Sequence, residues 1–245
     1  MKFPLKRPIT YTLIFVLTWQ PALVSAGAVV VDATSGANKP TLDAALNGVP
    51  IINIVTPTAK GVSHNKYTQF NINSQGLILN NGKTLSKTDL AGYIQGNPNL
   101  ASGSASIILN EVTAANRSQL NGYAEIAGQS AEFILANPYG ITCSGCGFIN
   151  TPRATLTTGT ANMLDGGLTG FSVEGGDITL GDFNANNVNR VDVLARAIAI
   201  NGDIQAKKIN LITGRNDIDY ATLNPTAKVD DGSTAPAFAL DVAAL

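Results

Sequence analysis

Cysteine and histidine are among the scarcest residues of this 245-residue chain, which has two cysteines and one histidine. A structural zinc site takes four protein ligands, usually two cysteine pairs or one pair with histidines. Cys143, Cys146 and His64 cannot complete such a site. The sequence also contains no P-loop and no G-x-G-x-x-G phosphate-binding loop. It therefore predicts no metal and no cofactor.

Charged residues are also few, at 13% of the chain, and lysine and arginine form no cluster. A nucleic-acid-binding surface needs a basic patch or stripe, so this composition argues against nucleic acid as a partner. Apolar residues reach 44%, which is too high a share for intrinsic disorder. The sequence indicates a folded chain with a substantial hydrophobic core.

Long apolar runs are absent except near the N-terminus. The run at residues 9–19 follows three basic residues and is shorter than the roughly 20 residues of a membrane-spanning helix. Val24 and Ala26 suit the last positions before a cleavage site, which completes the layout of a secretory signal peptide. An N-terminal anchor is the alternative. We predict a signal peptide at residues 1–26, export through the Sec machinery, and a mature domain at residues 27–245 without a stable membrane anchor.

What the chain does contain is short runs of β-branched residues between Asn, Gly, Asp and Ser, the pattern of many short strands joined by turns. Stretches that favour helix are scarce. Asn and Gly tolerate positive φ, so the Asn-Asn-Gly sequence at 80–82 predicts a tight turn. The sequence predicts an all-β fold. The clearest candidate strands lie within residues 49–55, 70–82, 105–112 and 131–140.

The second half shows a loose internal repeat. Segments 171–187, 191–207 and 209–220 can be aligned with Phe171, Val191 and Ile209 in register. A spacing of roughly 18–20 residues is expected of a β-solenoid, in which each coil buries its apolar face against its neighbours. An ordinary β-sandwich with strands of similar length is the alternative.

Alternation along residues 191–196 supports strands with one buried and one exposed face. Val191, Val193 and Ala195 would point inward. Asp192, Leu194 and Arg196 would point outward, although the alternation is imperfect.

The C-x-x-C pair has three interpretations. A disulfide between Cys143 and Cys146 is favoured in an exported chain. A redox centre of the thioredoxin type would place the pair at the start of a helix, but the flanking residues resemble strand and turn. A partial metal site is the third. A disulfide across so short a loop contributes only about 2 kcal/mol by loop entropy, so it would mainly fix a local turn.

Catalytic candidates are weak. Ser63 and His64 are adjacent, but no G-x-S-x-G nucleophile turn is present, and sequence adjacency does not make a catalytic triad; a surface or turn histidine is the better interpretation. Asp177, Asp192 and Arg196 could line one face of a solenoid, as in polysaccharide-degrading β-helix enzymes, but nothing in the sequence selects them. The sequence predicts that the chain is not an enzyme.

The motif residues resemble a known family. Paired Asn-Pro motifs, "NPNL" at 97–100 and "NPYG" at 137–140 with the cysteine pair after the second, are similar to those in the secretion domain of two-partner secretion exoproteins. These are the filamentous haemagglutinin, haemolysin and contact-dependent growth inhibition proteins of Gram-negative bacteria. The resemblance covers about Val49 to Leu240, and segments 61–72, 108–138 and 213–218 strengthen it.

The resemblance implies a right-handed parallel β-helix with an N-terminal cap and extra-helical hairpins. It also implies a non-enzymatic export-targeting module. Such a domain is recognised in the periplasm by the POTRA domains of a dedicated outer-membrane β-barrel transporter, passes through the barrel and folds outside. The expected location is therefore the cell surface or the medium of a Gram-negative bacterium. An adhesin whose solenoid surface binds a host or bacterial ligand is the alternative.

The Asn-Pro motifs allow two interpretations. Pro fixes φ and keeps the preceding Asn extended, and Asn side chains satisfy nearby backbone groups, so both motifs suit structural turns. Recognition by the transporter is the other role that the resemblance implies. The candidate residues are Asn97, Pro98, Asn99, Leu100, Asn137, Pro138, Tyr139 and Gly140.

Family members are far longer than this chain and carry long repeat regions, often with a C-terminal toxin or adhesive region. We therefore expect residues 27–245 to be the N-terminal secretion domain of a much larger exoprotein. Any toxicity or adhesion of that protein would lie beyond residue 245.

Overall fold

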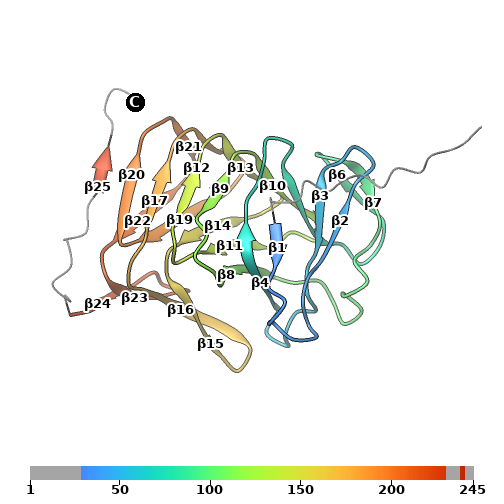
Figure 1. The fold of residues 1–245 in the computed structure, drawn as a ribbon, viewed down its shortest axis with the longest axis horizontal. Coiled ribbons are helices and arrows are strands. Elements are labelled where there is room, and N and C mark those ends of the chain that lie inside the picture. The colour runs from blue at the N-terminus through green and yellow to red at the C-terminus, as the bar shows by residue number, and fades with distance from the viewer. Residues whose placement is uncertain (1–28, 230–237, 241–245) are drawn as a thin grey trace, which may run out of the picture.

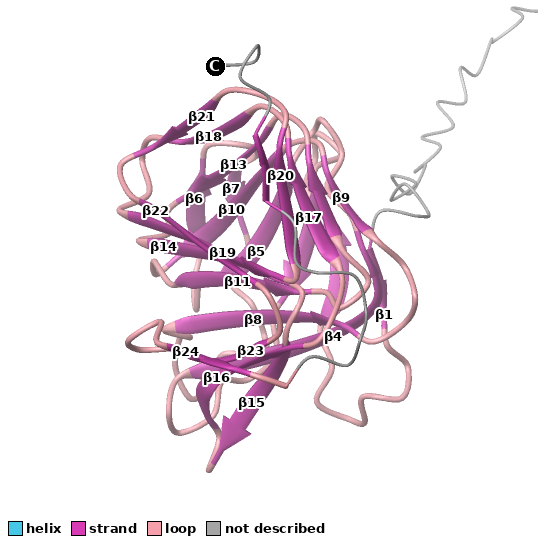
Figure 2. Cartoon of the chain, turned by 90° about the vertical axis from the view of Figure 1, so that its left-hand side faces the viewer, coloured by secondary structure: helices cyan, strands magenta, loops and turns pink. Residues whose placement is uncertain are grey.

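The computed structural model describes residues 29–229 and 238–240. The predicted signal peptide lies outside these residues. In the described part every regular element is a β-strand, which confirms the all-β prediction. Three sheets built mostly of parallel strands surround one core, and two smaller antiparallel sheets lie against them (Figures 1 and 2).

The first sheet has seven strands, and all its pairs are parallel except that of β1 with β4. In spatial order its strands are β1 (Val29–Val31), β4 (Val62–Phe70), β8 (Ile107–Val112), β11 (Glu132–Ala136), β14 (Arg153–Thr157), β19 (Arg190–Ala195) and β22 (Ile209–Thr213).

The second sheet also has seven strands, and again only the first pair, β2 with β3, is antiparallel. Its strands are β2 (Thr41–Ala44), β3 (Pro50–Asn53), β5 (Leu77–Asn81), β10 (Tyr123–Gly128), β13 (Cys146–Ile149), β18 (Phe183–Ala185) and β21 (Ile204–Ala206).

The third sheet has five strands, all parallel. From β8 onward the chain visits the first, third and second sheets in a fixed cyclic order, as in β8–β9–β10 followed by β11–β12–β13. An ordinary sandwich pairs its strands antiparallel, so this topology excludes that alternative. The strands of the third sheet are β9 (Ser118–Leu120), β12 (Ile141–Cys143), β17 (Asp177–Leu180), β20 (Ala197–Ile200) and β25 (Phe238–Leu240).

Two antiparallel sheets complete the fold. The four-stranded one, called the lid below, lies over the outer face of the first sheet (Figure 2). It consists of β15 (Thr160–Leu164), β16 (Gly167–Val173), β23 (Asn216–Asp219) and β24 (Pro225–Ala227). The two-stranded one is the hairpin of β6 (Ser86–Thr88) and β7 (Gly92–Ile94) at the N-terminal end of the molecule (Figure 1).

The space between the three large sheets is filled by apolar side chains from successive turns of the chain. Phe133, Phe148 and Phe183 follow one another at centroid distances of 4.9 and 5.9 Å. All three are buried, and burial of one such side chain stabilises a fold by about 1.5–3 kcal/mol. The core therefore packs strands of different sheets, and neighbouring strands of one sheet, against each other. An isolated strand pair would lack this packing and would not be stable.

The repeat prediction is confirmed for one pair and wrong for another. Val191 pairs in parallel with Ile209, as predicted. Phe171 does not stack on Val191, because it lies in the antiparallel lid; Val191 pairs with Ala154 instead. The repeat resumes after the lid, where Ile178 pairs with Ile198.

Two local predictions are also wrong. Asn80 and Asn81 form the buried end of β5 rather than a tight turn, and the turn comes earlier, at 73–76, where Gly76 has φ 85°. Along β19, Asp192 and Leu194 are fully buried, not exposed. The lid covers the face that the alternation assigned to solvent.

Candidate functional site

The two Asn-Pro motifs form turns of the same construction. In the first turn, residues 97–100, the Leu100 N–H donates to the Asn97 carbonyl at 3.2 Å, and the Asn99 N–H donates to the Asn97 side-chain oxygen at 2.9 Å. In the second turn, residues 137–140, the Gly140 and Tyr139 N–H groups make the same two bonds to Asn137, at 3.0 and 2.9 Å. Each asparagine thus stabilises its own turn twice.

The Asn97 side chain is buried and also anchors the first turn to the sheets. Its amide donates to the carbonyl of Ile54 at 2.9 Å and to that of Asn80 at 2.8 Å. The Asn97 N–H donates to the carbonyl of Gly82 at 2.7 Å. Because a buried amide must find partners for its hydrogen-bonding groups, Asn97 is held by the fold.

Asn137 is held in the same way at the edge of the third sheet. Its side-chain amide donates to the Asn116 carbonyl and to the Ser118 hydroxyl, each at 2.9 Å. The residue is fully buried. Asn137 directly follows β11, so its side chain joins the end of that strand to the start of β9.

The residues of the motifs that reach solvent are different ones. Tyr139 has 46% of its surface exposed, and Pro98 is also exposed, whereas Leu100 and Gly140 are buried. Asn99 and Pro138 are half-buried. Of the eight candidate residues, only Pro98 and Tyr139 are exposed on the folded domain.

A groove of about 550 Å³ lies beside Pro98, between β2, β3 and the β6–β7 hairpin. Leu46 and Tyr93 line it and are strongly exposed. Glu125 fixes the hairpin by accepting hydrogen bonds from the N–H groups of Asp89 and Leu90 at 2.7 and 2.8 Å. Burial raises the pKa of Glu125, and these two donors oppose that effect.

Arg117 packs against Gly140 at the end of the second turn. Its guanidinium donates to both carboxylate oxygens of Asp177, at 2.9 and 2.6 Å, and to the hydroxyl of Thr142 at 2.8 Å. These hydrogen bonds hold the pKa of the Asp177 carboxyl below its ordinary value. Sequence patterns did not indicate Arg117, because its partners lie 25 and 60 residues away along the chain.

The cysteine pair lies where the chain passes from the third sheet to the second. The sulfur atoms of Cys143 and Cys146 are at disulfide distance, with Cα atoms 5.4 Å apart. Cys143 ends β12, Cys146 begins β13, and Gly145 between them has φ 76°. Both sulfurs belong to the main core and are buried. The surroundings are strand and turn, with no helix at whose start a thiolate could be stabilised.

The catalytic candidates are not brought together. Ser63 is buried and donates to the Val55 carbonyl at 2.8 Å. His64 lies within β4, not in a turn, and contacts the Glu111 carboxylate at 2.8 Å. Asp177 belongs to the third sheet and pairs with Arg117, while Asp192 belongs to the first and pairs with Arg153.

Within residues 29–229 and 238–240, no group of three or more His, Cys, Asp or Glu side chains could hold a metal ion. The same residues include no helix with the length and apolar character that crossing a membrane requires.

One protein family and several known proteins match most of this chain. The family described as "TPS secretion domain" matches residues 27–245. "Toxin CdiA" of Yersinia pestis is 44% identical over 240 residues, which is 97% of this chain and 7% of that protein. "tRNA nuclease CdiA" of Escherichia coli (strain STEC_O31) is 46% identical over 224 residues, or 89% of this chain and 7% of that protein.

Among solved structures, the crystal structure of the filamentous hemagglutinin secretion domain is similar in fold. It superposes with a TM-score of 0.79 at 35% identity, covering 89% of this chain and 74% of that one. The chain spans only about 7% of the curated relatives.

Proposed function

The chain belongs to the TPS secretion domain family, and we propose that it is the export-targeting module of a large two-partner secretion exoprotein. In this proposal the POTRA domains of a cognate outer-membrane β-barrel transporter recognise the module in the periplasm. The transporter then directs the exoprotein to the surface or the medium of a Gram-negative cell. The observation that carries the proposal is the family match over residues 27–245.

We infer that the three large sheets are the faces of a right-handed parallel β-helix. The cyclic order of the strands and their parallel pairing support this, and crossovers between parallel strands are right-handed in nearly all proteins. The antiparallel strands β1 and β2 stand at the N-terminal edges of two faces, as a cap would. The lid and the β6–β7 hairpin would be the extra-helical hairpins.

Within the Asn-Pro motifs we assign different roles to different residues. Asn97 and Asn137 are buried and hydrogen-bonded, which supports a folding role. Pro98 and Tyr139 are exposed, which makes them available for contact with the transporter. The groove lined by Pro98, Leu46 and Tyr93 extends the exposed surface around Pro98.

We propose no catalytic role for this domain. The nuclease named for some relatives is an activity of much longer proteins, and any such activity of this exoprotein would reside outside the secretion domain. The disulfide distance between Cys143 and Cys146, three residues apart, supports a local structural role for the pair.

Secretion is the direct test. The chain is expressed with its N-terminal segment, with and without the cognate transporter, and the medium is compared with the periplasm. We expect the chain in the medium only when the transporter is present. Equal release without the transporter would contradict the proposal.

The motif assignment needs variants that separate folding from recognition. Tyr139→Ala and Pro98→Ala should keep the unfolding midpoint in urea and lower the secreted fraction. Asn137→Ala should lower both, because its side chain is part of the fold. If Tyr139→Ala and Pro98→Ala are secreted like the unaltered chain, the exposed motif residues have no role in recognition.

A further inference from the structure

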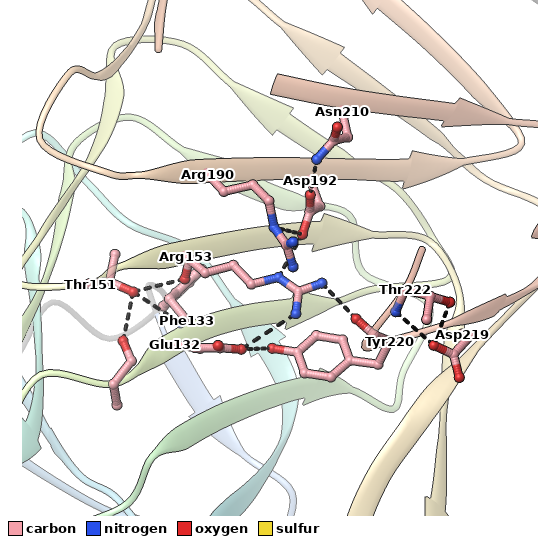
Figure 3. Close-up of polar contacts among 11 residues, drawn as sticks. Glu132, Phe133, Thr151, Arg153, Arg190, Asp192, Asn210, Asp219, Tyr220 and Thr222 are labelled. Atoms are coloured by element: carbon pink, nitrogen blue, oxygen red, sulfur yellow. Dashed lines mark hydrogen bonds and ion pairs between the residues drawn. The ribbon is translucent and has the colours of Figure 1, made fainter. Parts of the chain in front are cut away.

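The lid covers a face of the first sheet that is partly apolar and partly charged. Leu109, Ile134 and Leu194 of the sheet pack with Phe171 and Ile218 of the lid in a cluster separate from the main core. Beside this cluster lies a group of charged side chains centred on Arg153 (Figure 3). A continuous apolar face would have been enough to hold the lid, so the charged group requires a separate explanation.

The charged group joins the first sheet to the lid through Arg153 of β14. The Arg153 side chain is only 8% exposed. Its guanidinium donates to the Asp192 carboxylate at 2.6 Å and to the Tyr220 carbonyl at 2.9 Å, and it lies 3.9 Å from the centre of the Tyr220 ring. The Tyr220 hydroxyl donates to Glu132, whose carboxylate is 3.5 Å from Arg153.

Asp192 is held by two further groups, the Asn210 amide at 2.7 Å and the Arg190 guanidinium at 3.3 Å. Tyr220 directly follows β23 of the lid and donates its N–H to the Thr169 carbonyl at 2.9 Å. We call Glu132, Arg153, Asp192 and Tyr220 the latch. Of these four residues, only Tyr220 comes from the lid.

The latch connects residues that are far apart in sequence. Arg153 is 39 residues from Asp192 and 67 from Tyr220, and Glu132 is 88 residues from Tyr220. Arg153 and Asp192 lie on the paired strands β14 and β19, so only the two contacts of Tyr220 span more of the sequence than the strand pairs of the first sheet. Contacts over larger separations carry a larger loop-closure cost and tend to form late. The parallel strand pairs of the first sheet can therefore form before the lid closes.

The charged groups of the latch add little to the free energy of lid closure, which the apolar cluster mainly supplies. Arg153 and Asp192 would be hydrated with the lid open, and closing it removes them from water. The attraction between buried charges commonly does little more than offset that desolvation. The hydroxyl oxygen of Thr155, beside Asp192 in the sheet, adds to the cost, because it is buried without a hydrogen-bond partner within the described part of the chain.

We propose that the latch sets the point at which the chain stops being competent for export: with the lid open the chain can still be drawn into the transporter, and lid closure through Arg153 and Tyr220 commits it to the folded state. This proposal rests on the export function above, because it concerns when the transporter can still use the chain. With the lid open the fold lacks the burial of the apolar cluster, so it unfolds more readily to the extended chain that a pore can pass.

Hydrogen exchange on the purified full chain tests the latch without any transporter. We expect Arg153→Met to accelerate exchange in β16 and β23 by roughly tenfold or more, with little change in β5, β10 and β13. Tyr220→Phe, which keeps the ring and loses only the bond to Glu132, should act in the same direction to a smaller extent. If Arg153→Met does not fold, the exchange rates of Tyr220→Phe provide the test instead.

Thr155→Val provides the opposite change. It removes a buried hydroxyl without changing the side-chain shape, so the lid should close more firmly and β16 and β23 should exchange more slowly. Arg117→Met is the matched control, since Arg117 makes an equally short ion pair on the third sheet, away from the lid. It should accelerate exchange in β12 and β17 and leave the lid unchanged. Equal acceleration of every sheet by Arg153→Met would overturn the latch.

Secretion with the transporter at a limiting level then tests the regulatory role. The secreted fraction of Arg153→Met or Tyr220→Phe should rise by about twofold, since slower lid closure leaves more time for export, and that of Thr155→Val should fall. Unchanged fractions despite altered lid exchange would overturn this role and leave the export function standing. Transporter-independent release of the unaltered chain would instead contradict the export function itself.

Discussion

The Arg117 guanidinium occupies the space that a side chain on Gly140 would need. A β-carbon built on Gly140 would clash with the guanidinium, and the φ of Gly140 is 100°, a region that favours glycine. The second Asn-Pro turn thus ends on a residue fixed both by backbone conformation and by the ion pair beneath it.

This arrangement predicts a difference between two glycine substitutions. Gly145 has a φ of 76° but open space around it, so Gly145→Ala should cost only the backbone strain, about 1 kcal/mol. Gly140→Ala has the same kind of strain and also displaces Arg117, so it should cost at least about 1 kcal/mol more. Urea unfolding of both variants measures the difference. In an Arg117→Ala background the extra cost of Gly140→Ala should shrink; an unchanged cost would show that the guanidinium does not matter.

The Arg117–Asp177 pair also predicts a pH dependence. Hydrogen bonds from Arg117 depress the pKa of Asp177 in the folded state. The stabilisation is therefore present above the unfolded pKa of about 3.9 and is lost as pH falls through the lower folded pKa. Because Asp177 is 52% exposed, we expect no more than about 1 kcal/mol.

Asp177→Asn should remove this contribution. The difference in unfolding free energy between the unaltered chain and Asp177→Asn should be constant from neutral pH to about pH 5 and should shrink below about pH 4. Arg117→Met should flatten the profile in the same region. A difference that grows on acidification would contradict the assigned direction.

Asn137 and Tyr139 of one turn should differ sharply in their effects on stability. Asn137→Ala removes the three hydrogen bonds of a fully buried side chain and leaves their partners unsatisfied, and it should cost about 2–4 kcal/mol. Tyr139→Ala removes a side chain that is 46% exposed and should cost less than about 1 kcal/mol. Denaturant unfolding compares the two. Equal costs would mean that the tyrosine ring supports the turn as much as the asparagine does.

The sequence was sufficient for the strands and for part of the stacking. Segments 105–112 and 131–140 contain β8 and β11, and Val191 stacks on Ile209, because β-branched runs and solenoid spacing are local signals. It was not sufficient for the Asn-Asn-Gly segment at 80–82. The Asn81 side chain is hydrogen-bonded to the backbone of Ala105 and Gln129. Turn propensity depends only on neighbouring residues and does not predict such distant partners.

The lid explains the other errors. It interrupts the repeat at Phe171, and it buries Asp192 and Leu194 on a face that alternation assigns to water. No local pattern predicts that an antiparallel sheet will cover the outside of a parallel one. For the same reason Arg153 was not foreseen, since its partners come from two other strands and from the lid.

The cysteine pair contributes to the free energy of unfolding in two separable ways. Joining residues three positions apart restricts the unfolded chain only slightly, so replacing Cys143 and Cys146 by alanine should cost about 2 kcal/mol in loop entropy. Both sulfurs lie in the core, which adds a packing loss of about 1 kcal/mol or more. Reduction without mutation should cost only the first part, since the sulfur atoms remain in place. Comparing oxidised, reduced and double-alanine chains in urea therefore separates the covalent contribution from the packing contribution. Two free thiols titrating in protein purified without reductant would show that no disulfide forms, and reduction would then have no effect on stability.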